Sequence, residues 1–232
     1  MIVFTRKLVR QVRIDGVFGV FAKIPIWLRT QRETRLDRKL GIATMGRIEA
    51  TESVGAEPRP QHLENAVFYA PLPFARFNRL MRAAQPFDPS EYTFIDYGAG
   101  KGRALALAAD MGFRHVVGVE LFESLCVQAR LNIAAFAERQ PHAADIELLC
   151  VDAAAYRPPP GNLFCYFYNP FDDVVIRKVL ARLEAACRSA PRRIVIAYSN
   201  PQHAEVFDTA CFLRAHYRSE TMCVYVGSAE SP

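Results

Sequence analysis

The sequence predicts an α/β protein built on a doubly wound, mostly parallel sheet. From residue 92 onward, short runs of apolar, β-branched and aromatic residues alternate with longer stretches of helical periodicity, an order typical of βαβ units. The short runs are apolar almost throughout, as expected for strands covered by helices on both faces. A glycine-rich loop follows the first run, at the position where such sheets bind ligands.

The expected elements can be placed by residue number. Five strands are expected at residues 92–96, 115–120, 146–151, 163–168 and 193–199. Helical spacing of apolar residues predicts helices at residues 74–84, 101–111, 122–140 and 172–189. The C-terminal tail, C-F-L-R-A-H-Y-R followed by E-T-M-C-V-Y-V-G, supplies two more strands joined by a short turn. The prediction is therefore a seven-stranded sheet with helices on both faces.

Positive charge is concentrated near the N-terminus. Residues 1–47 contain eleven Lys and Arg against three Asp and Glu, so the rest of the chain, whose total net charge is +5, carries −3. Residues 46–62 are polar and contain Gly and two prolines, a composition typical of a linker. We therefore predict a basic N-terminal extension and linker at residues 1–62 and one domain at residues 63–232.

Two interpretations of this basic segment remain open. Either it packs on the domain with its arginines in solvent, or it docks on an anionic surface such as lipid, RNA or an acidic protein. Its apolar stretch, residues 17–28, is interrupted by Lys23 and Pro25 and is shorter than the roughly 20 residues that a spanning helix needs. It also lacks the small-residue cleavage site of a signal peptide. We therefore expect no transmembrane segment.

The six cysteines are spread along the chain, with no C-x-x-C pair and no Cys/His cluster at zinc spacing. Several of them, including Cys150 and Cys165, lie inside apolar runs. Buried, reduced thiols are therefore expected, which favours a cytoplasmic protein and argues against a metal site.

The loop behind the first strand reads D-Y-G-A-G-K-G-R, residues 96–103. A P-loop requires Ser or Thr after its lysine, but Gly102 follows Lys101. The dinucleotide fingerprint is G-x-G-x-x-G, whereas here the third glycine comes one residue early. The carboxylate of Asp96 would also repel a pyrophosphate. An acid at this position instead favours a ligand with positive charge or hydroxyl groups.

This D-x-G-x-G-x-G loop resembles motif I of the class I S-adenosylmethionine (SAM)-dependent methyltransferases, whose sheet is Rossmann-like. Later positions extend the resemblance. Glu120 ends the second expected strand, Asp152 follows the third, and the fourth ends in Y-F-Y-N-P-F, which is similar to motif IV of amine-directed methyltransferases. The resemblance covers about residues 68–226 and implies SAM as the cofactor.

The resemblance also implies roles for individual residues. An acid at Glu120 accepts both ribose hydroxyls, and Asp152 lies near the adenine amino group. Upstream, Tyr69-Ala70-Pro71 matches a Y-x-P segment, which either covers the bound cofactor or is a rigid loop whose tyrosine simply packs. The implied cofactor-binding residues are Tyr69, Asp96, Tyr97, Gly98, Ala99, Gly100, Gly102, Glu120, Asp152 and Asn169.

Within the class, the patterns D-x-G-[S/A]-G-K-G-R and F-x-N-P-F are closest to small bacterial methyltransferases of undefined substrate. The likeness to seven-strand protein-lysine methyltransferases is more distant. Methyl transfer to a protein lysine or another amine is implied, with Asn169 as the catalytic residue that accepts a hydrogen bond from the amine. The sequence reads N-P-F and not N-P-P-F, so the acceptor stays unidentified, either a protein or a small molecule.

Two further alternatives stay open. Lys101 and Arg103 lie at a helix start, where cations oppose the helix dipole. They either meet the cofactor's carboxylate or an anionic substrate, or point to solvent.

Two competing functions also stay open for the whole protein. One is a non-catalytic module that binds RNA, lipid or another protein through residues 1–47, and the other is a nicotinamide-dependent oxidoreductase.

Overall fold

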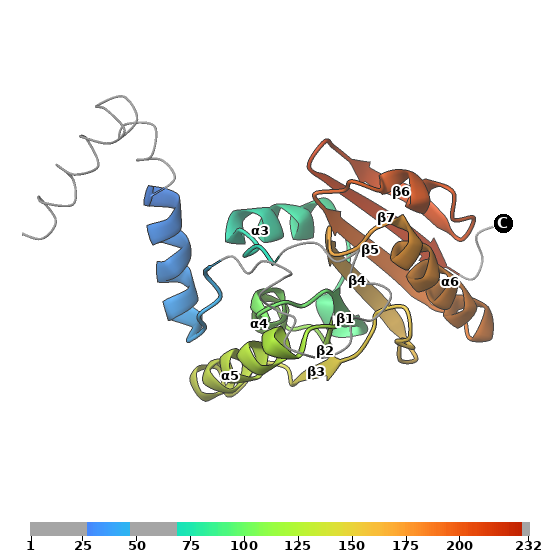
Figure 1. Ribbon diagram of the computed structural model, residues 1–232. Helices are drawn as coiled ribbons and strands as arrows, with labels where there is room; N and C mark the ends of the chain where they lie inside the picture. The colour runs from blue at the N-terminus through green and yellow to red at the C-terminus, as the bar shows by residue number, and fades with distance from the viewer. Residues whose placement is uncertain (1–26, 47–68, 229–232) are drawn as a thin grey trace, which may run out of the picture.

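The computed structural model describes residues 27–46 and 69–228. Its centre is a seven-stranded sheet with the strand order β3-β2-β1-β4-β5-β7-β6 (Figure 1). Strands β1 to β5 are parallel to their neighbours, and β7 runs antiparallel to both β5 and β6. The chain first moves outward from β1 to β3 and then returns to the other side of β1. The switch point of the sheet therefore lies between β1 and β4.

The strands and helices lie where the sequence predicts them. The strands are β1 (Tyr92–Tyr97), β2 (His115–Glu120), β3 (Ile146–Cys150), β4 (Asn162–Tyr168), β5 (Arg193–Ser199), β6 (Leu213–Arg218) and β7 (Met222–Ser228). The helices are α3 (Phe74–Ala83), α4 (Arg103–Asp110), α5 (Glu123–Arg139), α6 (Asp173–Ser189) and α7 (Ala204–Asp208), with a 3-10 turn, η2 (Pro89–Glu91). Residues 27–40 form a further helix. The predicted fold class is confirmed, and helix 27–40, η2 and α7 were not anticipated as separate elements.

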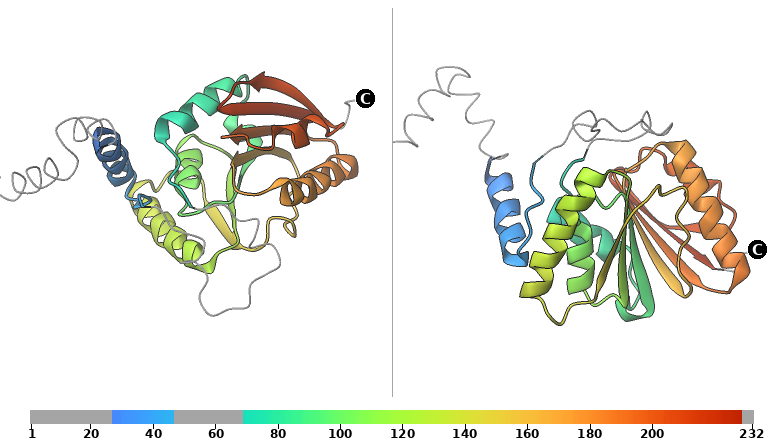
Figure 2. Two further views of the ribbon diagram at one scale, coloured as in Figure 1. Left: turned by 45° about the horizontal axis from the view of Figure 1, so that its top comes forward. Right: turned by 60° about the horizontal axis from the view of Figure 1, so that its bottom comes forward.

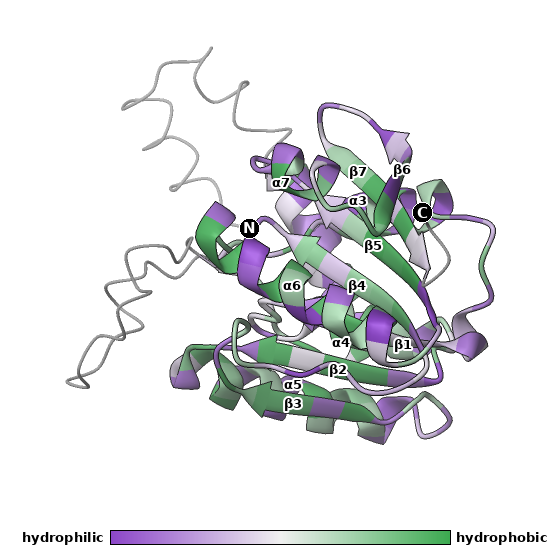
Figure 3. Ribbon diagram, turned by 90° about the vertical axis from the view of Figure 1, so that its right-hand side faces the viewer, coloured by the Kyte–Doolittle hydropathy of each residue, from purple (hydrophilic) through white to green (hydrophobic). Residues whose placement is uncertain are grey.

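Helices cover both faces of the sheet, as the apolar strands require. Helices α3, α4 and α5 pack on one face, and α6 and α7 on the other (Figure 2). Successive side chains of a strand point to opposite faces, so Phe94 packs under α3 and α4 while Ile95 faces α6. Strands β4 and β5 are hydrophobic along most of their length (Figure 3), and their interior residues are buried.

The described part of the predicted N-terminal extension packs on this domain. Helix 27–40 lies beside α5 at one end of the molecule (Figures 1 and 2). Leu36 and Leu40 pack against the core on the α3–α5 face. Arg139 of α5 donates a hydrogen bond to the carbonyl oxygen of Arg38 (3.1 Å), and the N–H of Ala43 donates to Oδ1 of Asn132 (2.8 Å).

Most of two predicted segments, the apolar stretch 17–28 and the linker 46–62, lies outside the described residues. Among the helices that the structure does describe, none is both long and apolar enough to cross a membrane.

Candidate cofactor-binding and active site

A cavity of about 180 Å³ opens at the carboxyl ends of β1, β2 and β4. This edge is where ligands bind in doubly wound sheets. Eight of the ten residues implied as cofactor contacts line it: Tyr69, Asp96, Gly98, Ala99, Gly100, Glu120, Asp152 and Asn169. The order of strands therefore gathers residues that lie up to a hundred positions apart in the sequence.

The other two implied residues do not line the cavity. Tyr97 follows Asp96 on β1, so its side chain points to the opposite face, where its ring stacks on that of Phe167 with centroids 4.9 Å apart. Gly102 has φ +83° and precedes α4, and its carbonyl oxygen accepts the hydrogen bond from the N–H of Ala106 (3.1 Å). Its left-handed backbone ends the loop and begins the helix.

The loop has glycine at positions 98 and 100 because neighbouring residues occupy the space that a Cβ would take there. Gly98 has φ +89°, and a Cβ there would lie 2.5 Å from Cβ of Pro170. Gly100 has φ +56°, and a Cβ there would lie 2.6 Å from the ring of Tyr69. The N–H groups of Gly98 and Ala99 both donate to the carbonyl oxygen of Val119. The loop thus holds Tyr69 and Pro170 at the cavity, and these two N–H groups are used within the protein.

Glu120 connects the end of β2 to the glycine loop. One carboxylate oxygen accepts from the N–H of Gly100 (2.8 Å), and the other accepts from the N–H groups of Leu121 (2.9 Å) and Phe122 (3.0 Å). Burial raises the pKa of this carboxyl group, although the three N–H donors act in the opposite direction. The side chain is therefore fixed in position at the wall of the cavity.

Asp96 is the second buried acid in the cavity. Burial raises its pKa well above the usual carboxyl range, and the negative charge of Glu120 raises it further. Two neighbouring acids of this kind disfavour a bound phosphate and favour a cationic group, which would compensate both charges.

Asp152 lies just after β3 and Asn169 just after β4, and both side chains line the cavity. Oδ1 of Asp152 accepts from the N–H of Ala154 (2.8 Å), which closes the turn after β3. Asn169 has φ +44°, and its Oδ1 accepts from the hydroxyl of Tyr198 (3.0 Å). The N–H of His203 in turn donates to the Tyr198 oxygen (3.3 Å). The amide of Asn169 is therefore oriented by a short chain of hydrogen bonds.

Three residues at this edge were not anticipated from the sequence. The hydroxyl groups of Tyr166 and Ser199 are buried without a hydrogen-bond partner among the described residues, and Tyr166 lines the cavity. Asn200 also lines it and has φ +53°. The signal for Asn200 was present, because β4 and β5 are neighbours and both end in Asn-Pro, at 169–170 and 200–201.

Comparisons with known proteins agree with this architecture. No protein-family model matches the sequence, and no curated protein does. Among solved structures, the PH0226 protein from Pyrococcus horikoshii has a TM-score of 0.50 at 14% identity, over 66% of this chain and 89% of that chain. An RNA methyltransferase from Salinibacter ruber, in complex with S-adenosyl-L-homocysteine, gives 0.49 at 19% identity, over 70% of this chain and 95% of that chain. Magnesium protoporphyrin IX methyltransferase from Synechocystis PCC 6803, with bound SAM, gives 0.44 at 13% identity, over 66% and 76%.

The strand order, with antiparallel β7 inserted between β5 and β6, decides the class of fold. The chain has the fold of the class I methyltransferases. The likeness concerns the fold alone, because the identities are below 20%.

Arg103 joins this fold to the N-terminal segment, an arrangement that the sequence left open. Its guanidinium forms ion pairs with Glu33 (2.6 Å) and Asp37 (2.9 Å) of helix 27–40, and its Nε donates to the hydroxyl of Thr44 (2.6 Å). Arg103 is 3% exposed. Both acids of the described extension thus form ion pairs with one buried arginine at the start of α4.

Lys101 and Tyr69 also contact the N-terminal segment. The ammonium of Lys101 lies 5.0 Å from the centre of the Tyr69 ring and donates to the carbonyl oxygen of Met45 (3.4 Å). The Tyr69 hydroxyl donates to the carbonyl oxygen of Thr44 (2.6 Å). Burial lowers the pKa of Lys101 and raises that of Tyr69. Residues 42–46 therefore support the tyrosine that packs on Gly100.

One group of potential metal ligands occurs among the described residues, formed by Glu123, Cys126 and Cys150. Glu123 pairs with Arg130 (2.8 Å), and burial raises the pKa of both thiols. All six cysteines lie in the described part of the chain, and all are free.

Proposed function

We propose that this protein is a SAM-dependent methyltransferase whose cofactor binds in the cavity at the ends of β1, β2 and β4. The observation that carries the proposal is the pair of buried acids, Asp96 and Glu120, beside a glycine loop in a class I methyltransferase fold. SAM has an ammonium, a sulfonium and a ribose diol and no phosphate, so it suits this pair, whereas a dinucleotide does not.

In this proposal, different residues of the cavity bind different chemical groups of the cofactor. Asp96 would hold the ammonium, Glu120 the ribose hydroxyls and Asp152 the adenine amino group, with Tyr69 covering the glycine loop. A carboxylate has about four lone-pair sites, and Glu120 already accepts three N–H groups. We infer that binding both ribose hydroxyls requires Glu120 to release a backbone donor, for which Gly100 is the candidate.

The proposed acceptor is an amine, on a protein or a small molecule. SAM supplies a methyl carbon activated by the sulfonium, so the protein's task is to align the acceptor and exclude water. Oδ1 of Asn169 accepts one hydrogen bond from Tyr198, which leaves a second lone pair for an N–H of a neutral amine. Asn169 is thus proposed as the residue that orients the acceptor nitrogen.

Calorimetric titration with S-adenosylhomocysteine, the product of methyl transfer, tests cofactor binding. Replacing Glu120 by Ala removes the ribose contact and should weaken binding by roughly 30- to 150-fold, on the order of 2–3 kcal/mol. Glu147→Ala is the matched control, because Glu147 is an exposed acid on the neighbouring strand β3 and should leave the affinity within about twofold.

Either of two results would contradict the proposal: no binding of S-adenosylhomocysteine at millimolar concentration, or equal affinity for wild type and Glu120→Ala. Binding of NADH in the same assay would favour the oxidoreductase instead. Catalysis is tested separately with methyl-labelled SAM and cell extract as the source of acceptors. Asn169→Ala should lose label transfer by about 100-fold while it retains affinity for S-adenosylhomocysteine.

A further inference from the structure

Helix 27–40 presents an outer face whose positive charges have no acidic partner among the described residues. Its two acids, Glu33 and Asp37, are buried and pair with Arg103. Its basic side chains are all exposed, and none forms an ion pair with another described residue. We call these five residues the basic face: Arg29, Arg32, Arg35, Arg38 and Lys39.

The arrangement of the basic face favours an extended anionic ligand. Arg32, Arg35 and Lys39 follow one another at spacings of three and four residues, so they form a row along the helix. Arg38 lies three residues after Arg35 and widens that row. A row of exposed cations with no interspersed acid produces a positive potential that attracts polyanions.

The apolar side of the same helix argues against a lipid surface as the partner. An interfacial helix buries an apolar face among the lipids. Here that side is already occupied, since Leu36 and Leu40 pack on the domain core. The exposed large apolar residues in the described part of this helix are Trp27 (50% exposed) and Leu28 (54%), which is too little to insert helix 27–40 along its length.

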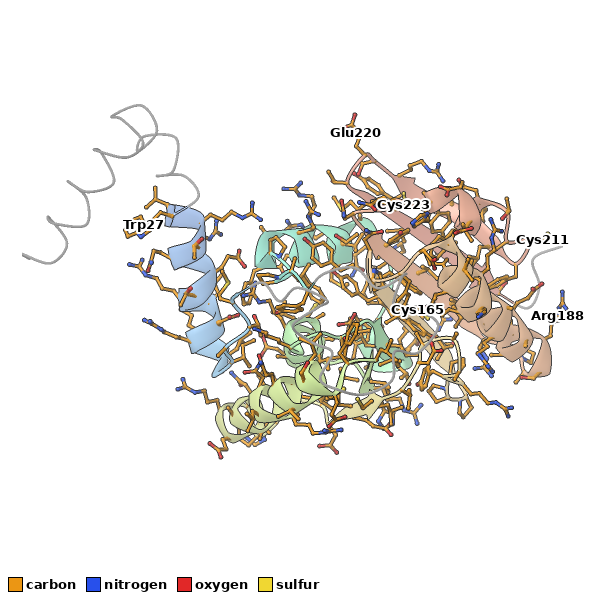
Figure 4. All side chains as sticks on the ribbon, in the orientation of Figure 1. Trp27, Cys165, Arg188, Cys211, Glu220 and Cys223 are labelled. Carbon is orange, nitrogen blue, oxygen red and sulfur yellow. The ribbon has the colours of Figure 1, made fainter. Side chains whose placement is uncertain are left out.

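The side-chain chemistry instead matches nucleic acid. Four of the five cations are arginines, whose planar guanidinium binds phosphate oxygens in a bidentate manner. Trp27 is the first described residue of this helix, and its side chain lies on the side away from the domain (Figure 4). An exposed indole beside a row of arginines can stack on an unpaired base, as aromatic residues do in single-strand binding sites.

We propose that helix 27–40 binds the phosphate backbone of a single-stranded nucleic acid through the basic face, with Trp27 stacking on a base. The helix also binds Arg103 at the end of the glycine loop. This contact is made by the buried side of the helix, so binding on the basic face does not depend on SAM.

The experiment titrates the full-length protein with a fluorescent 20-nucleotide oligouridine and follows its anisotropy. Trp27 is the only tryptophan of the chain, so its intrinsic fluorescence reports contact at the helix and should be quenched on binding. Salt should weaken binding, with a slope of log K against log salt of about −3 if four or five phosphates are contacted.

Charge reversal locates the site. Arg32→Glu combined with Arg35→Glu should weaken binding about tenfold or more and flatten the salt dependence. The matched control is Arg177→Glu combined with Arg188→Glu, which makes the same change of net charge on exposed residues of α6; Arg188 lies at the opposite end of the molecule from Trp27 (Figure 4). An unchanged thermal midpoint, measured by circular dichroism, verifies that each variant folds.

Three results would overturn the proposal. They are equal loss of affinity in both double variants, no quenching of Trp27, and tighter binding to phosphatidylserine vesicles or polyglutamate than to the oligouridine at the same salt concentration. None of these measurements uses SAM or S-adenosylhomocysteine, so their failure is distinguishable from failure of the proposed methyltransferase activity.

Discussion

Gly98 and Gly100 have a packing role in addition to any contact with a ligand, because Pro170 and Tyr69 occupy the space where a Cβ would lie. We expect Gly100→Ala to displace Tyr69 from the cavity and to weaken the binding of S-adenosylhomocysteine about tenfold or more, with a loss of stability. Calorimetry and thermal unfolding measure the two effects.

Gly112 supplies the control for Gly100, since it has φ +82° and no atom lies within 4 Å of the place that a Cβ would take there. Gly112→Ala should cost about 1–2 kcal/mol of stability from backbone strain alone and leave ligand affinity unchanged. Equal affinities for wild type and Gly100→Ala would show that the contact with Tyr69 does not shape the site.

The raised pKa of Asp96 leads to a pH dependence of ligand binding. In the free protein, burial and the charge of Glu120 keep this carboxyl group protonated at pH values where an exposed aspartate is ionised. Because its folded pKa lies above its unfolded pKa, the free protein loses stability as pH rises through that interval. The ammonium group of the ligand favours the ionised form of Asp96, so binding of S-adenosylhomocysteine should release a proton and strengthen as pH rises through the raised pKa.

Calorimetry in two buffers with different ionisation enthalpies measures this proton release at a pH inside the interval. Asp96→Asn should abolish it. Proton uptake on binding, or the same release from Asp96→Asn, would contradict the assignment of Asp96 to the ammonium of the ligand.

At the scale of elements, the ion pairs of Arg103 connect helix 27–40 to α4. Removing one partner of a buried ion pair leaves an unpaired buried charge and costs about 3–5 kcal/mol. Arg103→Met should therefore lower the free energy of unfolding by about this amount and also weaken ligand binding, because Arg103 follows the glycine loop directly. Urea denaturation measures the first effect.

Arg130→Met is the control for Arg103, since its pair with Glu123 is exposed and such pairs contribute about 0–1 kcal/mol. A similar, small change of the urea midpoint in both variants would mean that helix 27–40 contributes little to the stability of the domain.

The sequence allows the elements to be predicted because the relevant information is local. Apolar runs and helical spacing locate β1–β7 and the helices between them, and the acids at strand ends meet because parallel strands share an edge. The alternation of side chains on β1 also shows, in retrospect, that Asp96 and Tyr97 cannot both line one cavity.

The partners of Arg103 could not be predicted in this way. Glu33 lies seventy residues earlier in the chain, and no local pattern encodes a pairing across that distance. A count of charges does not show this pairing either, because it does not distinguish buried acids such as Glu33 and Asp37 from exposed ones. The orientation of Asn169 by Tyr198 was missed for the same reason, since their hydrogen bond joins the ends of two strands.

At the scale of the whole molecule, the proposed cofactor cavity and the basic face are connected through helix 27–40 and Arg103. The proposed cofactor cavity contains two buried acids, while the exposed charged side chains of helix 27–40 are all cations. Under the two proposals, the cavity would bind a small cationic ligand and the basic face a large anionic partner, and Arg103 links the helix that carries this face to the glycine loop.

The most direct test of the central claim is a crystal structure of the protein grown with S-adenosylhomocysteine. We predict electron density for the ligand in the cavity, with both ribose hydroxyls within hydrogen-bond distance of Glu120 and the ammonium within reach of Asp96. Density for the ligand elsewhere on the molecule, or an empty cavity at a ligand concentration of several millimolar, would contradict it.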